Sequence, residues 1–151
     1  MMHEQGTGGA PKYGTVAQLP LVGSVSDPLS NKTVPRGAPD EGSVGHYQAK
    51  TSQNVIVELA ATSHAGVYQY TFPVGSTQNN ILVDVSHVLP SFRTGEAGGL
   101  GQEYQGGEFT LFQDGHYEAS GIYNMGWNRS PDWTIYSCKR MPRPFKLISD
   151  A

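Results

Sequence analysis

The amino-acid sequence predicts an all-β fold, an incomplete antiparallel β-sandwich with long glycine-rich loops. Three observations support this prediction. The 151 residues include 19 glycines and 10 prolines, a composition that favours many short strands joined by turns. Several short runs alternate between apolar and polar residues, as strands that bury one face do. An Asp-Gly pair at residues 114 and 115 separates two such runs, and this pair is typical of a hairpin turn.

The first 50 residues carry the weaker strand signals. Residues 16–22 form a short apolar run, which we expect to be interrupted or confined to a sheet edge because Pro20 cannot donate a ladder hydrogen bond. Residues 23–45 are rich in Ser, Pro, Gly and Asp, so we expect a long surface loop there. Loops of that length are uncommon inside compact domains and tend to be functional or disordered.

Three runs in the middle of the chain predict an antiparallel meander. They cover residues 55–61, 66–72 and 81–85, and short turn segments separate them. Each run alternates, so that its apolar side chains share one face. The apolar faces consist of Val55, Val57 and Leu59, then Tyr68, Tyr70 and Phe72, then Ile81, Val83 and Val85.

The last third of the chain predicts a hairpin and one further strand. Residues 90–107 hold many glycines and are expected to form a second glycine-rich loop. Residues 108–112 and 116–123 flank the Asp-Gly pair, whose two central residues both need positive φ in the tight turn. Residues 133–138 form the last strand, and the basic, proline-containing residues that follow are expected not to continue it. The lone cysteine, Cys138, is expected to be a small core residue.

Composition and motifs argue against several function classes. The net charge is −3 with no basic stripe, so no nucleic-acid partner is predicted. No apolar stretch approaches the roughly 18 residues that a membrane span needs, so no membrane partner is predicted. The N-terminus lacks the basic and apolar regions of a secretory signal. Phosphate-binding, dinucleotide-binding and zinc-protease patterns all fail on spacing, and the five histidines are scattered.

The segment from His3 to Gly14 is the strongest candidate for a binding loop. Its glycines let the backbone approach a ligand closely, and a His and a Glu stand directly before them. We interpret it as a loop whose preceding structure is not included in the chain.

Two other groups of residues leave alternatives open. No catalytic carboxylate pair can be built, although Glu108 and Glu118 either face each other across the hairpin or belong to a solvated surface. The aromatic side chains near the C-terminus either pack in the core, which is the favoured interpretation, or stack on sugar rings. These are Tyr123, Trp127, Trp133 and Tyr136.

Several segments, in order, resemble glycoside hydrolase family 92, the calcium-dependent exo-α-mannosidases. The first is His3-x-x-Gly6-Thr7-Gly8-Gly9, followed by Pro20-Leu21-Val22. The second, residues 57–73, resembles the family segment with a glutamate, a Thr-x-His and a final Phe-Pro. The later matching segments are residues 81–87, 121–124 and 133–138. The resemblance departs from the family at Gln5, where the family usually has Ser, and it ends at Cys138.

The resemblance implies a two-domain parent enzyme. Residues 1–138 would be part of its N-terminal β-sandwich domain, and residues 139–151 would be an unrelated exposed tail. The general acid, the general base and the calcium ligands would come mainly from a C-terminal (α/α)6 barrel that is absent here. No catalytic residue, metal ligand or cofactor is therefore expected in this chain, and its partners would be the barrel and an α-mannoside glycan. The resemblance implies substrate-binding positions in the first loop, at His3, Glu4, Gly6, Thr7 and Gly8.

Three functions follow from these observations. The chain is expected to contribute to the substrate pocket of a glycan-hydrolysing α-mannosidase, without being catalytic alone. The alternatives are a stand-alone carbohydrate-binding β-module and a non-enzymatic interaction domain. No signal peptide is predicted in the chain, although full-length members of the resembled family are often secreted.

Overall fold

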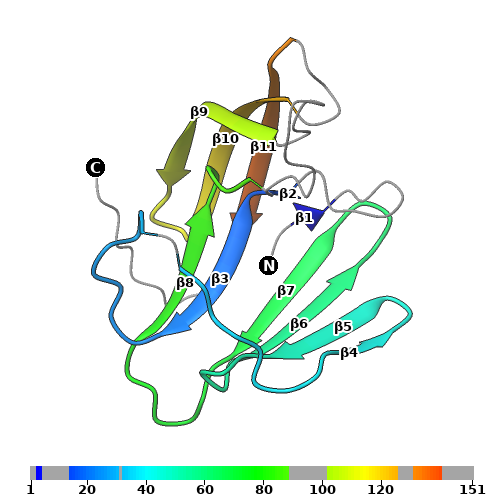
Figure 1. The fold of residues 1–151 in the computed structure, drawn as a ribbon, viewed down its shortest axis with the longest axis vertical. Helices are drawn as coiled ribbons and strands as arrows, with labels where there is room; N and C mark the ends of the chain where they lie inside the picture. The colour runs from blue at the N-terminus through cyan, green and yellow to red at the C-terminus, as the bar shows by residue number, and fades with distance from the viewer. Residues whose placement is uncertain (1–2, 5–13, 31, 89–101, 126–130, 141–151) are drawn as a thin grey trace, which may run out of the picture. The chain divides into compact units, whose positions relative to one another are not determined.

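A computed structural model of the chain describes residues 3–4, 14–30, 32–88, 102–125 and 131–140 (Figure 1). All regular elements in these ranges are strands, so the predicted all-β fold class is confirmed, and the antiparallel sheets are consistent with a sandwich-like fold. No helix in these ranges is long and apolar enough to cross a membrane. The strands are β1 (His3–Glu4), β2 (Gly14–Thr15), β3 (Ala17–Val22), β4 (Glu41–Ser43), β5 (His46–Lys50), β6 (Ile56–Ala61), β7 (Gly66–Thr71), β8 (Asn79–Asp84), β9 (Gln102–Leu111), β10 (His116–Met125) and β11 (Trp133–Arg140).

The chain divides into two compact units. The first unit comprises residues 1–18 and 83–151, and the second unit comprises residues 19–82. The chain leaves the first unit within β3 and returns to it within β8. The two strands pair with each other in a two-stranded sheet.

The first unit is built on the antiparallel sheet β9-β10-β11, with the long strand β10 at its centre (Figure 1). Successive side chains of β10 alternate between burial and exposure because strand side chains point to opposite faces. We call the face that carries Tyr117, Ala119 and Tyr123 the inner face, since all three are buried. The opposite face, which carries Glu118, Ser120 and Ile122, is the outer face.

Two glycines that pair across β9 and β10 lie where an added side chain would not fit. Gly107 lies opposite Gly121 in the register. A Cβ atom at Gly107 would overlap the backbone carbonyl oxygen of Ser120, and one at Gly121 would lie 2.7 Å from the ring of Tyr123. The buried ring of Tyr123 therefore covers the space that a side chain at Gly121 would need. Residues with side chains are excluded at both positions unless the sheet shifts.

The predicted hairpin joins β9 and β10, but its turn differs from the expected one. Gly115 has a φ of 91°, whereas Asp114 is not in the left-handed region, so only one residue needs positive φ. The amide of Gly115 donates to the carbonyl of Phe112 at 3.1 Å, and the amide of Phe112 donates to the carbonyl of His116 at 2.9 Å. The connection is thus a three-residue loop ending in a glycine, the next most common hairpin geometry.

Both edge strands of this sheet, β9 and β11, are longer than the sequence predicts. β9 begins at Gln102, so the expected loop over residues 90–107 is wrong for its last six residues. β11 continues to Arg140, so the expectation that the strand stops at Cys138 is also wrong. Both extensions pair with β10, where Gln102 lies opposite Met125 and Arg140 lies opposite His116. Pairing to a long central strand outweighs the glycines and charges that suggested loops.

The second unit contains the antiparallel sheet β4-β5-β6-β7. Val55 and Val57 are buried, as the alternation predicts, and Leu59 is half-buried. Tyr68 and Tyr70 of β7 lie opposite Leu59 and Val57, so these apolar faces coincide. The strands β4 and β5 were not predicted, and the expected loop over residues 23–45 is wrong where β4 begins at Glu41.

The predicted three-strand meander is correct for β6 and β7 but wrong for β8. In the structure β8 pairs with β3 instead of extending the sheet from β7. Two hydrogen bonds at the end of β3 accompany this arrangement. The amide of Gly23 donates to the carbonyl of Gln78 at 3.0 Å, and Asn80 Nδ2 donates to the carbonyl of Gly23 at 2.6 Å. Alternation within a strand identifies its buried face but not its neighbour.

Candidate functional site

The ends of the predicted binding loop are paired with each other. His3 lies opposite Thr15 and Glu4 lies opposite Gly14 in the antiparallel pair β1-β2. These pairs join the residues on either side of segment 5–13, which itself lies outside the described residues. The other three predicted contact residues lie outside the described residues. These are Gly6, Thr7 and Gly8.

The second segment of the family resemblance forms the β6-β7 hairpin of the second unit. Its turn is closed by Thr62, whose amide donates to the carbonyl of Ala65 at 2.8 Å. The hydroxyl oxygen of Thr62 also accepts the amide hydrogens of His64 and Ala65, at 3.3 and 3.0 Å. The turn thus fixes the backbone around His64, whose side chain is exposed at the hairpin tip.

The outer face of the first unit carries an open depression of about 350 Å³. Most of its lining side chains come from two neighbouring rows of the sheet. One row consists of Thr110, Glu118 and Cys138, and the next consists of Glu108, Ser120 and Tyr136. Glu108 and Glu118 therefore lie diagonally across the hairpin and do not face each other directly. They share one surface, but the register does not set them up as an opposed catalytic pair.

Two residues of this surface lie where the sequence did not predict them. Cys138 was expected in the core but is exposed. Tyr136 has 81% of its surface exposed, whereas Tyr123 is fully buried. The favoured assignment of the aromatic residues to the core is thus correct for Tyr123 and wrong for Tyr136. The register would have shown the difference, because Tyr136 lies opposite Ser120 on the outer face.

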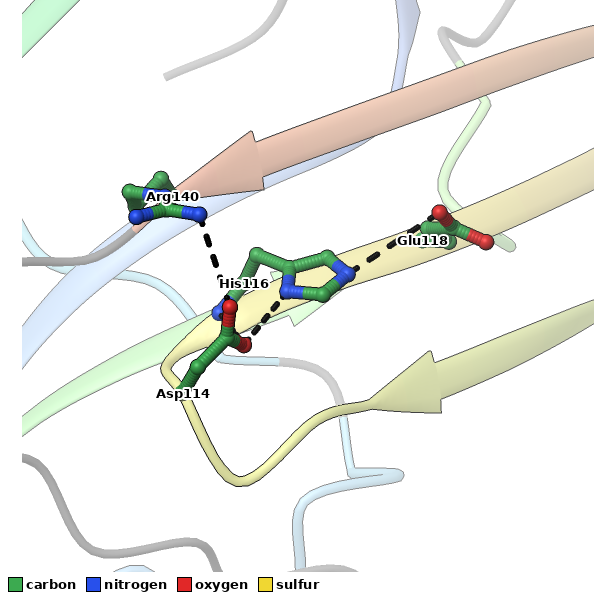
Figure 2. A network of polar contacts seen from close by, with 4 residues as sticks. All are labelled: Asp114, His116, Glu118 and Arg140. Carbon is green, nitrogen blue, oxygen red and sulfur yellow. Dashed lines mark hydrogen bonds and ion pairs between the residues drawn. The ribbon is translucent and has the colours of Figure 1, made fainter.

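A polar network lies beside the hairpin turn, at the end of the outer face (Figure 2). His116 Nδ1 lies 2.5 Å from Asp114 Oδ1, and its Nε2 lies 3.9 Å from Glu118 Oε1. Arg140 Nη2 lies 3.4 Å from the other carboxylate oxygen of Asp114. The ring of Phe112 stacks on the imidazole of His116, with centroids 4.1 Å apart. Hydrogen bonds from His116, first from its backbone amide, lower the pKa of the Asp114 carboxyl.

A second polar network lies on the inner face. Lys139 Nζ donates to Gln18 Oε1 at 2.8 Å, and Gln18 Nε2 donates to the hydroxyl of Tyr117 at 3.0 Å. Tyr117 also shares a side-chain hydrogen bond with Ser137. Burial disfavours charge on these groups, so it lowers the pKa of Lys139 to about 8 and raises the pKa of Tyr117. The network binds β3 to two strands of the sheet.

An aromatic cluster completes the inner face. Tyr123 stacks on Trp133 at 5.1 Å and meets the edge of Tyr104 at 5.7 Å. The Tyr123 hydroxyl donates to the carbonyl of Val85 at 2.5 Å, and burial raises the pKa of this phenol to about 12. These rings pack against one another across all three strands of the sheet.

The described residues bring no three His, Cys, Asp or Glu side chains together as a group that could hold a metal ion. We assign no calcium-dependent step to these residues.

Comparisons with known proteins identify the family of the chain. The model of the glycosyl hydrolase family 92 N-terminal domain matches residues 1–149. An uncharacterized secreted glycosidase of the fungus Arthroderma benhamiae is 26% identical over 106 residues. That alignment covers 60% of this chain but only 13% of the fungal protein, so the chain spans a small part of its relative. No solved structure matches the chain.

Proposed function

Because the chain belongs to the glycosyl hydrolase family 92 N-terminal domain family, we propose that it supplies part of the substrate pocket of a glycosyl hydrolase. The parent activity would be that of an α-mannosidase acting on glycans or glycoproteins. The family match over residues 1–149 is the observation that carries this proposal. The similarity to a secreted fungal glycosidase supports the glycosidase part of it.

The glycine loop is the proposed point of contact with the sugar. The β1-β2 pair joins the residues that flank segment 5–13. Glycines let the backbone approach a ligand, and a His, a Glu and a Thr can exchange hydrogen bonds with sugar hydroxyls. We therefore assign substrate contact to His3, Glu4, Gly6, Thr7 and Gly8. In this role they bind and orient the glycan.

Catalysis itself is assigned to a second domain. Inverting hydrolysis needs one carboxylic acid to protonate the leaving oxygen and one carboxylate to activate water, with space for that water between them. We assign neither role to a residue of this chain, and propose that a C-terminal (α/α)6 barrel provides both. The chain alone would then be non-catalytic.

Joining the chain to a family barrel domain tests the proposal. We expect the fusion to hydrolyse p-nitrophenyl α-mannoside with a higher kcat/KM than the barrel alone. Substitution of His3 or Thr7 by Ala should lower kcat/KM by about tenfold, because it removes contacts to the bound sugar. Gly42→Ala is the matched control, since Gly42 lies on β4 with open space around its Cα.

Two outcomes would contradict the proposal. Equal kcat/KM values for the fusion and for the barrel alone would show that the chain adds nothing to the pocket. Release of nitrophenol by the chain alone, at a rate that His3→Ala abolishes, would show that the chain is itself catalytic.

A further inference from the structure

We propose that the outer-face depression of the β9-β10-β11 sheet is a second sugar-binding site, in which Tyr136 stacks on a neutral pyranose ring. Glu108, Glu118 and Ser120 would bind the hydroxyls of that sugar. This inference rests on the proposed function, because the glycan of the parent enzyme supplies the ligand class. The site is separate from the glycine loop and uses none of its residues.

Tyr136 is the aromatic residue of this sheet whose ring is exposed and does not pack on another ring. The other rings described on β9, β10 and β11 are packed in pairs: Phe109 on Tyr117, Tyr104 and Trp133 on Tyr123. Within the described part of the chain, the side chain of Tyr136 makes neither a ring contact nor a hydrogen bond, and 81% of the residue's surface is exposed. A single exposed aromatic residue needs no explanation alone. Because Tyr136 lines a depression, its ring offers a surface on which the apolar face of a sugar can stack.

The polar side chains around Tyr136 match the hydroxyls of a sugar. Ser120 lies directly opposite Tyr136, and Glu108 lies opposite Ser120 on the other side, so the three form one row across the sheet. Glu118 and Thr110 stand in the next row. Hydroxyl groups donating to carboxylates make the stronger, charge-assisted class of hydrogen bond. A sugar ring has an apolar face and hydroxyl donors at its edge. It could therefore stack on Tyr136 and donate hydrogen bonds to Glu108 and Glu118.

The charge of the lining selects a neutral ligand. Two carboxylates line the depression, and its lining contains no Lys, Arg or His. The nearest basic side chains in the register are His116, whose Nε2 lies 3.9 Å from Glu118, and Arg140, which is paired with Asp114. An anionic ligand such as a sugar phosphate would therefore be repelled. The volume of about 350 Å³ lies at the small end of the range for ligand pockets, which suits one or two sugar units.

The paired strands that carry these side chains hold them in fixed positions. All of them lie where β10 pairs without interruption with both neighbours, since the register shift between β9 and β10 lies at Ile122/Tyr123, beyond the depression. The close Gly107–Gly121 pair and the inner-face network fix that pairing from the other side of the sheet. Sites built on strands hold their geometry more precisely than sites on loops.

Titration of the full chain with methyl α-D-mannopyranoside and methyl β-D-glucopyranoside tests the inference. We expect saturable shifts of the Tyr136 ring protons in NMR spectra at millimolar sugar for at least one of them. Tyr136→Ala should weaken the binding at this site by about tenfold, whereas Tyr136→Phe should keep it. Thr134→Ala is the matched control, because Thr134 is exposed on the same strand and face but does not line the depression.

Charge provides the second arm of the test. Mannose 6-phosphate should bind at this site more weakly than the neutral mannoside, and the double variant E108Q/E118Q should reduce that difference. Binding that is equal in Tyr136→Ala and wild type, or no shift of Tyr136 with either neutral sugar, would overturn the inference. His3→Ala should leave these shifts unchanged. The two proposals are therefore tested separately. The kcat/KM measurement can refute the role of the loop without affecting this site, and the Tyr136 titration can refute this site without affecting the loop.

Discussion

Gln18 Nε2 donates a hydrogen bond to the hydroxyl of Tyr117, at 3.0 Å, although the two residues lie 99 positions apart in the chain. Gln18 is nearly fully buried, so its amide lies out of water. The same amide accepts a hydrogen bond from Lys139 Nζ at 2.8 Å. One side chain on β3 thereby connects two neighbouring strands of the sheet that carries the proposed second sugar site. The stability of the first unit should depend on it strongly.

Replacement of Gln18 by Ala should destabilise the chain. It removes one hydrogen bond from Lys139 and one from Tyr117 in a largely buried region, and a lost buried partner costs about 1–3 kcal/mol. We expect a fall of about 2 kcal/mol in the free energy of unfolding, measured by urea denaturation with tryptophan fluorescence. Gln105→Ala is the control, since Gln105 is exposed on β9 and should change stability by less than about 0.5 kcal/mol. Equal effects of the two substitutions would contradict the importance of the network.

The lowered pKa of Lys139 predicts a rise in stability at alkaline pH. Its pKa is about 8 in the folded chain and 10.5 in its ordinary, solvated state, so between these values the unfolded chain binds more protons. Stability therefore increases with pH from about 8 to 10.5 through this group, and this contribution is lost as the pH falls through 8. Above pH 10 the raised pKa of Tyr123 acts in the opposite direction.

Comparison of wild type with Lys139→Met isolates this contribution. The difference in unfolding free energy between the two should change with pH between about 8 and 10. A difference that is constant across this window would show that Lys139 titrates normally. Tyr123→Phe offers a check on the upper limit, because it removes the phenol that opposes the rise.

Gly121→Ala should be among the most destabilising of small substitutions in this sheet. The added methyl group would meet the ring of Tyr123, which is fully buried and packed between Tyr104 and Trp133. Overpacking of this kind costs about 1–3 kcal/mol. Gly42→Ala, where nothing lies within 4 Å, should be close to neutral. Thermal unfolding of both variants checks this, and similar melting temperatures would show that the strands can separate to admit a side chain.

Asp114→Asn should destabilise the chain near neutral pH and have less effect in acid. Hydrogen bonds from His116 lower the pKa of Asp114 below its ordinary value of 3.8, so the folded state favours the ionised form. This contribution is present above pH 3.8 and is lost as the pH falls through the lower, folded value. The Asn variant lacks it, so the stability gap between wild type and variant should narrow below pH 4. A gap independent of pH from 6 to 3 would contradict the assignment.

Alternation identified buried faces well, because it reports a local property of each strand. Val55 and Val57 were assigned to the core from their spacing alone, and both are buried. Pairing partners were harder to predict, because they depend on residues far apart in sequence. β8 pairs with β3, and nothing within residues 81–85 distinguishes β3 from β7 as a neighbour.

The candidate site on the outer face could not be predicted for a similar reason, because it depends on how the strands pair. Tyr136 and Cys138 belong to an alternating strand, yet the sequence alone did not decide which of its faces is buried. The register with β10 decides it, since Tyr136 lies opposite Ser120 and Cys138 lies opposite Glu118. The glycine loop, by contrast, stood out from composition, and the family comparison followed from the order of its segments. The sequence therefore indicated the family while leaving the second candidate site hidden.

The most direct test of the proposed function is an NMR titration of the glycine loop. Amide signals of Gly6, Thr7 and Gly8 would be followed in the full chain as methyl α-D-mannopyranoside is added. The proposal predicts saturable shifts of these three signals that disappear in His3→Ala, with the β4 signal of Gly42 unmoved as the internal control. Loop signals that stay unchanged at saturating sugar, or shifts that persist fully in His3→Ala, would contradict the assignment of this loop to the substrate pocket.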